Sequence, residues 1–497
     1  MRKSFVAPLA ALLATACTVG PNYRAPEMAV PPTFAAPQPA PAPGAAIDPA
    51  RWWTAFGDPV LDGLVTRALK DSPDIAIAAS RVRQARLQEI AAGAVGKPMV
   101  NAAGNVSHVE FSKNAGFASL ARLFSGGGSG GGSGSGSTGG VALPGSGITT
   151  YALGFDASWE LDLFGGGRRG VEAATARAEG ATWSQRDAAV TLAAEVAQAY
   201  FALRLDQDQL AIGEQELTRE RRAQEIAAHV AQVGLSPQVD VSRQRAALTT
   251  LEARLQPVRA DAQVRIHSLG ILLGAQPESL LGELQQPLPA LGAAPAIPAG
   301  LPSDLLRRRP DVRAAERDLA GATADIGVAV ADLYPKFSLT GMVQLLSASL
   351  GNLFSTDSIQ ATGSAGVSFP LLDWGRRKAT VGMRKEDRVQ AYARYQRTVL
   401  GALRDVEDAL VRIDAERTRN ATLRRAVEDS ARVAQGVDAQ FRTGLVAQDV
   451  LLTAENQALV AREQLAASDA QLRQDTASLF KAIGGGWSEG ESAPAGQ

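Results

Sequence analysis

The chain contains one long sequence pattern twice. Trp159–Gly165 (WELDLFG) corresponds to Phe369–Gly375 (FPLLDWG) at an offset of 210 residues, and the same offset carries Gly234 onto Gly444. A unit of this size is far longer than the repeats of solenoid proteins. The duplication therefore predicts one fold built from two similar halves, neither of which is self-sufficient.

The offset is larger upstream, where Pro73 corresponds to Pro310 at 237 residues. The first copy must therefore hold 27 extra residues before Trp159, where a Gly/Ser-rich run occupies 125–140. Such a composition predicts a flexible loop between two strands. The expected segments are a signal peptide (1–16), a tether (17–50), repeat 1 (51–285), a linker (286–302), repeat 2 (303–484) and a flexible tail (485–497).

Charge and composition exclude several classes of function. The chain has 50 basic and 51 acidic residues, so no basic surface indicates nucleic acid as a partner. Its three histidines are scattered and its cysteine is single, and no Ser/His/Asp set or phosphate-binding loop is evident. Gly165–Gly167 are interpreted as the joint between a strand and a helix. We therefore expect no enzyme activity, no cofactor and no metal site.

The amino end has the pattern of an export signal. A basic start is followed by a short apolar stretch and by Ala14-Thr15-Ala16 before Cys17. Ordinary signal cleavage and lipoprotein processing are both open, but a lone thiol in an oxidising compartment favours acylation of Cys17 as a lipid anchor. The Pro/Ala-rich stretch that follows, 21–49, has few large apolar residues and is expected to be an extended spacer.

Four segments alternate strictly between apolar and polar residues, as a membrane β-strand requires. They cover about 100–107, 151–162, 337–345 and 361–371. A soluble sheet with one wet face would show the same pattern, but four such segments behind an export signal favour the membrane. The residues predicted to face lipid are Tyr151, Leu153, Phe155, Trp159, Phe337, Leu339, Val367 and Phe369.

Four strands cannot close a membrane barrel, because an open edge in lipid leaves backbone groups unpaired. Two chains would supply eight strands, whose interior is filled by side chains, and three would supply twelve, which leave a lumen. A usable pore therefore favours three chains.

Two long stretches without proline, 166–233 and 375–443, are rich in helix-forming residues. Val399, Leu403, Val406, Leu410 and Ile413 are spaced by four and three residues, which indicates a coiled-coil seam. Gly234 and Gly444 then end the helices, and return helices are expected over 238–273 and 448–483. Each copy is also expected to begin with a helical stretch, at 62–94 and 303–331.

Several motifs together resemble the TolC-like outer-membrane efflux factors, in particular their lipoprotein branch of the OprM and NodT type. The motifs are CTVGPNY at 17–23, WELDLFG at 159–165, RPDVRAAE at 309–316, and Tyr334-Pro335 before a strand. The resemblance covers nearly the whole mature chain. It implies a mainly α protein with membrane β structure: a trimeric twelve-stranded β-barrel, four strands per chain, continuing into a long periplasmic α-helical coiled-coil barrel. It also implies an outer-membrane location, with the helical part in the periplasm.

The resemblance further implies partners and sites. The partners would be two further copies of the chain, a periplasmic adaptor and an inner-membrane pump, usually of the resistance-nodulation-division class. Adaptor contact would fall at the helix tips, Val233, Gly234, Leu235, Thr443, Gly444 and Leu445. A periplasmic gate would involve Asp240, Phe441 and Asp449, although Asp449 lies one residue earlier than the family pattern places it and Phe441 lacks a tyrosine hydroxyl.

The predicted function is that of a passive conduit in a tripartite efflux system. The alternatives are a duct for secreted proteins fed by a type I system, and a periplasmic coiled-coil scaffold without a pore.

Overall fold

The computed structural model describes residues 18–37, 47–110, 148–286, 289, 291–295, 300 and 302–487. The signal segment, Cys17, the 125–140 run and residues 488–497 lie outside the described residues. The chain separates into two compact units. The sheet unit contains Met1–Asn22, Gln88–Ala173 and Thr323–Glu386, and the helical unit contains Tyr23–Leu87, Ala174–Ala322 and Asp387–Gln497. Both units draw on both sequence copies.

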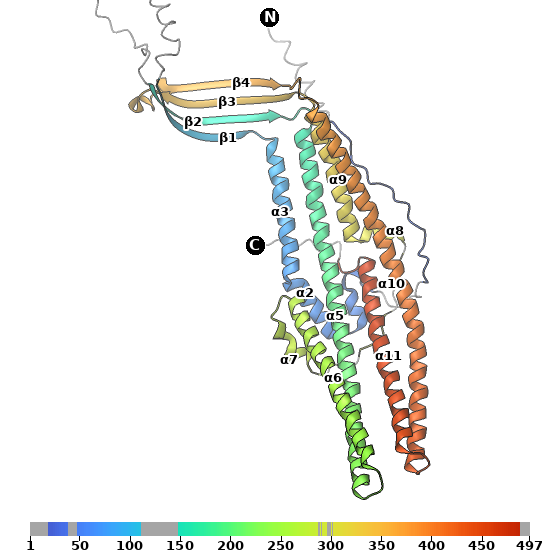
Figure 1. Ribbon diagram of the computed structural model, residues 1–497. Coiled ribbons are helices and arrows are strands. Elements are labelled where there is room, and N and C mark those ends of the chain that lie inside the picture. Colours follow the sequence, from blue (N-terminus) through green and yellow to red (C-terminus); the bar gives the residue numbers. More distant parts are fainter. Residues whose placement is uncertain are drawn as a thin grey trace, which may run out of the picture. The chain divides into compact units, whose positions relative to one another are not determined.

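The sheet unit holds a single four-stranded antiparallel sheet, in the order β1-β2-β3-β4 (Figure 1). Its strands are β1 (Met99–Val109), β2 (Ile148–Leu161), β3 (Lys336–Ser347) and β4 (Ile359–Ser368). Two short 3-10 turns, Leu350–Asn352 and Thr356–Ser358, lie between β3 and β4. The sheet therefore pairs one hairpin from each sequence copy, joined through β2 and β3.

The fourth predicted strand is too long at its carboxyl end. β4 ends at Ser368, so Phe369, predicted to face lipid from within the strand, lies one residue beyond it. Pro370 follows directly. Because proline has no backbone N–H to donate to a strand ladder, the pairing with β3 stops before it.

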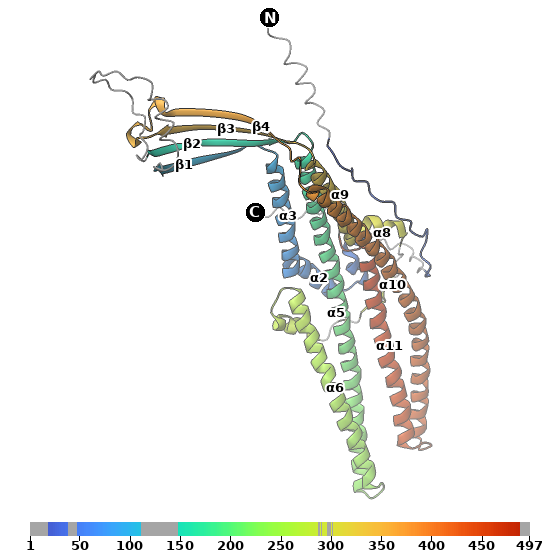
Figure 2. The ribbon, with the colours of Figure 1, turned by 45° about the horizontal axis from the view of Figure 1, so that its top comes forward.

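Helices make up the rest of the fold, and two of them have 67 residues each. In chain order the bounds are η1 (Pro49–Phe56), α2 (Pro59–Asp71), α3 (Pro73–Val95), α5 (Gly166–Gln232), α6 (Gln238–Leu272), η2 (Pro277–Leu280), α7 (Leu281–Leu284), α8 (Pro302–Arg308), α9 (Pro310–Ala331), α10 (Arg376–Arg442) and α11 (Gln448–Ala482). In the helical unit α5 and α6 form one hairpin, hairpin one, and α10 and α11 form another, hairpin two (Figures 1 and 2).

The helical stretch expected over 62–94 is interrupted once, so that the structure has two helices there. α2 ends at Asp71 and α3 begins at Pro73, with the extended Ser72 between them. The residue before a proline is disfavoured in the helical conformation. The second copy breaks in the same way, at Arg309 between α8 and α9.

The core of the helical unit is aromatic and aliphatic. Trp52 of η1 is fully buried and stacks on Phe480 of α11 with ring centroids 4.8 Å apart. The predicted coiled-coil seam is confirmed here, because Val399, Val406 and Leu410 are almost completely buried. α5 contains one stretch apolar enough to cross a membrane, but 56% of it is buried within the protein, as in a core helix.

The stretch expected to be an extended spacer, 21–49, packs against the helical unit in its described part at 21–37. Phe34 is only 7% exposed and belongs to the core of the helical unit. The backbone amides of Ala35 and Ala36 donate to the two carboxylate oxygens of Glu407 in α10, at 2.7 and 3.0 Å. Tyr23 donates its hydroxyl to Glu316 of α9 at 3.1 Å. The buried Phe34 ring, the two backbone hydrogen bonds and the Tyr23 hydroxyl hold this proline-rich segment against α9 and α10.

Candidate functional site

The sheet has one apolar and one polar face. Cross-strand pairing sets Phe155 opposite Val343 and Trp159 opposite Leu339. In the single chain Phe155 is 62% exposed and Val367 66%. An exposed apolar face of this kind indicates a surface that is covered by lipid or by another protein.

The polar face is cross-linked by side-chain hydrogen bonds. Asn101 donates to Asp156 at 3.0 Å, joining β1 to β2. Thr340 and Ser364 lie 2.6 Å apart and join β3 to β4. Strands of a membrane barrel pair apolar residues toward lipid with polar residues toward a lumen in this way.

Within the described chain β1 and β4 each pair on one side only. Their outer edges leave a row of backbone N–H and C=O groups without partners in the sheet. Since such an edge cannot persist in lipid, further strands must come from other chains.

Strand and helix meet at an aspartate in each copy. After β2, the Asp162 carboxylate accepts from the backbone N–H of Arg168 at 2.9 Å. After β4, Asp373 accepts from the Arg377 N–H at 3.2 Å, and this bond lowers the pKa of Asp373. Glycines in left-handed conformation, Gly165 and Gly375, make the turn. The interpretation of the first glycine run as a strand–helix joint is confirmed.

The two hairpin tips have the same geometry. Gly234 and Gly444 have φ values of +77° and +74°. Leu235 donates its N–H to the Val230 carbonyl at 3.0 Å, and Leu445 to that of Gln440 at 2.9 Å, which is the hydrogen-bond pattern of a glycine-terminated helix. Both leucines project into solvent, and they are 80% and 76% exposed.

The predicted gate residues lie on different hairpins. Asp240, in the first turn of α6, accepts from the Ser236 hydroxyl at 2.9 Å and pairs with Arg243 at 3.4 Å. Asp449 is exposed in the first turn of α11, and Phe441 lies near the end of α10. Among the described residues no hydrogen bond or ion pair joins these three, and no group of three or more His, Cys, Asp or Glu side chains could hold a metal ion.

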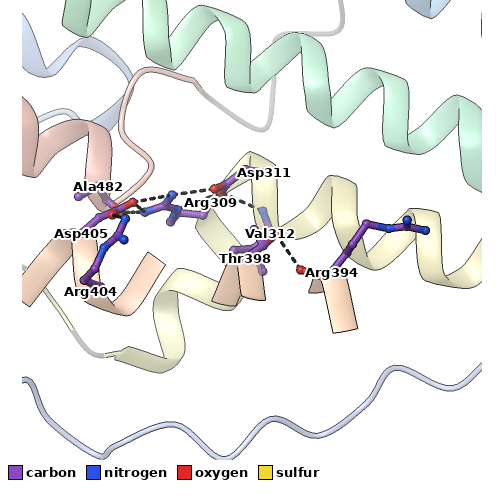
Figure 3. A network of polar contacts seen from close by, with 8 residues as sticks. All are labelled: Arg309, Asp311, Val312, Arg394, Thr398, Arg404, Asp405 and Ala482. Carbon is purple, nitrogen blue, oxygen red and sulfur yellow. Dashed lines mark hydrogen bonds and ion pairs between the residues drawn. The ribbon is translucent and has the colours of Figure 1, made fainter. Parts of the chain in front are cut away.

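A partly buried polar network at the root of hairpin two was not predicted. Figure 3 shows Arg309, in the turn before α9, between Asp311 and Asp405. Its guanidinium donates to Asp311 at 2.6 Å, to Asp405 of α10 at 3.2 Å and to the Ala482 carbonyl of α11 at 3.2 Å. One side chain thus ties both helices of hairpin two to α9. The basic run before Pro310 is the sequence signal that could have indicated it.

The hairpins are also linked to each other. Arg254 of α6 donates to Glu463 of α11, and Gln198 of α5 donates to Ser478 of α11 at 3.0 Å. Sequence reasoning missed both contacts, because they join residues that the repeat pattern places in different copies.

An alternating sheet with open edges, joined through glycine turns to long coiled-coil hairpins, defines the subunit of an outer-membrane channel. A family model described as outer membrane efflux protein matches residues 64–275 and 301–485, and the chain belongs to this family. It is 28% identical to nodulation protein T of Rhizobium leguminosarum bv. viciae, over 96% of this chain and 92% of that protein. It is 29% identical to the pyoverdine export outer membrane protein OpmQ of Pseudomonas putida, over 89% of each.

A similar structure is that of the outer-membrane channel OprN. It has a TM-score of 0.82 and 30% sequence identity, and the match covers 95% of this chain and 100% of that one. The fold is that of the trimeric TolC-like channels, in which each chain contributes four strands to a twelve-stranded barrel and long helices to a periplasmic barrel. The protein is an outer-membrane channel component of a tripartite efflux system. The predicted fold class, location and function are confirmed, and the scaffold without a pore is excluded by the family.

Proposed function

We propose that three copies of this chain form a passive outlet for small molecules, fed by a periplasmic adaptor and an inner-membrane pump of the resistance-nodulation-division class. The observation that carries this proposal is the four-stranded sheet with two open edges and two opposite faces. The chain supplies a path but no source of energy, so the pump must supply the work. We assign no chemical step and no cofactor to the protein.

The helix tips are the proposed contact with the adaptor. Val233, Leu235 and Leu445 are exposed there beside the turn glycines, and Thr443 occupies the place of the valine in the second tip. An exposed leucine beside a hydrogen-bonded turn suits a complementary apolar pocket, because a turn that is already formed loses little conformational entropy on binding.

The proposed gate lies beside the tips, with Phe441 just before the second tip and Asp240 and Asp449 just after the first and second tips. Three copies of each aspartate would form rings around the axis, whose like charges repel unless a cation or a partner screens them. We also propose that Cys17, which lies outside the described residues, carries the lipid anchor.

The experiment is extraction of the protein from outer membranes in detergent, followed by mass measurement and planar-bilayer conductance. A particle of three chains that conducts supports the proposal. A single chain per particle without conductance contradicts it. Efflux of small dyes from cells that also express a candidate adaptor and pump, compared with secretion of a type I protein substrate, decides between the two kinds of cargo.

A further inference from the structure

The first described residues of the chain lie against the joint between β2 and α5, which the channel function does not explain. The Val19 N–H donates to the Phe164 carbonyl at 3.1 Å. Thr18 packs on Gly165, where an added Cβ would lie 2.9 Å from the Thr18 Cα. All of these residues belong to the sheet unit.

A second close approach follows at once. Gly20 lies on Gly327 of α9, and a Cβ at residue 20 would be 2.5 Å from the Gly327 Cα. Gly20 also has a φ of +90°, a conformation that residues with side chains rarely adopt. The backbone of the segment therefore packs directly against the backbone of α9 at these two glycines.

A buried arginine binds the segment. Arg169 of α5 is 3% exposed. Its guanidinium donates to the Val19 carbonyl at 3.2 Å, to the Gly20 carbonyl at 3.4 Å and to the Asn22 side-chain oxygen at 2.6 Å. Its remaining hydrogen bond goes to Glu172 at 2.6 Å. Without the segment, a buried cation would keep one carboxylate and lose three acceptors, which is an unfavourable state.

We propose that Arg169, Gly165 and Gly327 form a docking site for the chain's own segment Thr18–Asn22, and that this site fixes where the amino end of the mature chain meets the membrane. β2 ends at Leu161, three residues before Phe164. The docked segment thus lies where the strand leaves the bilayer, an assignment that rests on the outer-membrane location of the strands. The lipid anchor proposed above would then enter the bilayer beside the sheet and not at the end of a free tether.

The test is hydrogen exchange of the backbone amides of residues 18–23 in the purified full-length protein. Arg169→Met removes the donors and keeps most of the side-chain stem, and we expect it to speed exchange of the Val19 amide at least tenfold. The matched control is Arg168→Met, since Arg168 is the adjacent arginine and bonds to Asp162 instead. That variant should leave exchange in residues 18–23 unchanged.

A second variant keeps the test decisive if Arg169→Met does not fold. Gly20→Ala alters only the segment, and it should also speed exchange at least tenfold, because its new methyl group would meet Gly327. An insertion of five Gly/Ser residues between Asn22 and Tyr23 tests whether the segment is held by its own contacts or only by its covalent link to the packed residues that follow. Protection of Val19 should survive this insertion.

Unchanged Val19 exchange in both Arg169→Met and Gly20→Ala would overturn the proposal, as would loss of protection on the insertion. Planar-bilayer conductance of the same preparations tests the channel function separately, because a conducting channel with an undocked segment contradicts only the docking site.

Discussion

Arg309 and Asp405 join the turn before α9 to α10, with the guanidinium nitrogen 3.2 Å from the carboxylate oxygen. At the repeat offsets, the first copy has Ser72 and Glu195 in these places, and Glu195 is exposed. In both copies a glycine in left-handed conformation packs against the corresponding turn: Gly274 in the first copy and Gly484 in the second. This charged clamp at the root of hairpin two is therefore not repeated at the corresponding positions of the first copy.

Loss of this clamp should loosen hairpin two. In Arg309→Met, Asp311 and Asp405 lose their partly buried partner, and we expect a loss of about 1–3 kcal/mol of stability. The midpoint of thermal unfolding measures this loss. Arg307→Met is the matched control, because Arg307 is exposed in α8, two residues before Arg309. Equal midpoints for the two variants would contradict a structural role for the clamp.

Asp187 lies near this network, and its raised pKa should make the free energy of unfolding depend on pH. Burial, with the neighbouring Asp311 carboxylate, raises the pKa of Asp187 above its ordinary value of 3.8. The folded state therefore binds its proton more tightly than the unfolded state, so the free energy of unfolding falls as the pH rises above that value. Asp187→Asn should raise the unfolding midpoint at pH 7, and the gain should disappear below about pH 4. A gain that persists in acid would show that ionisation is not its cause.

A substitution at Gly484 tests the close packing of the end of α11 on the turn between α8 and α9. Its φ is +76°, and an added Cβ would lie 2.9 Å from the Arg308 carbonyl oxygen. Gly484→Ala should cost roughly 1–3 kcal/mol, from backbone strain and this contact. In Gly436→Ala, within α10 and with nothing near its Cβ position, the same methyl group should stabilise by about 0.5–1 kcal/mol. Chemical denaturation of the two variants gives the comparison.

The second hairpin tip is tested by Gly444→Pro. Proline cannot adopt the φ of +74° found there, and it lacks the N–H that Gly444 donates to the Phe441 carbonyl. We expect efflux to fall while the trimer survives, because the tip lies far along the chain from the sheet. Cell-based dye efflux and the mass of the extracted particle are the measurements. Normal efflux would argue against docking or opening at this tip.

Charge placement on the sheet distinguishes its faces. Phe155 lies near the middle of β2 on the apolar face, and Phe155→Arg should cost about 2–4 kcal/mol if that face meets lipid. Thr362→Arg places the same charge near the middle of β4 on the polar face and should be tolerated. The yield of trimer extracted from outer membranes reports the difference. A reversed order of yields would mean that the faces are assigned the wrong way round.

Local patterns were enough to predict much of this fold. The two-residue period of Tyr151 to Leu161 predicts a strand with two unlike faces, and the four-and-three spacing from Val399 to Ile413 predicts a buried helix seam. The glycines at 234 and 444 predict turns because only glycine adopts a left-handed backbone without strain. The duplication and the resemblance of the motifs then predicted the family.

What the sequence determined by itself is therefore the set of elements, their repetition and the need for other chains to close the sheet. Only the tertiary structure decided that Arg309 reaches Asp405 and that Arg169 holds the segment after the signal. These contacts join residues 96 and 150 positions apart. Hydrophobic periodicity reports which face of an element is buried, whereas a polar contact between distant residues depends on which groups the packing brings within about 3 Å. Composition predicts only an extended spacer for 21–49, because it does not show that Phe34 is buried in the core or that hydrogen bonds to Glu316 and Glu407 hold the described part of this stretch.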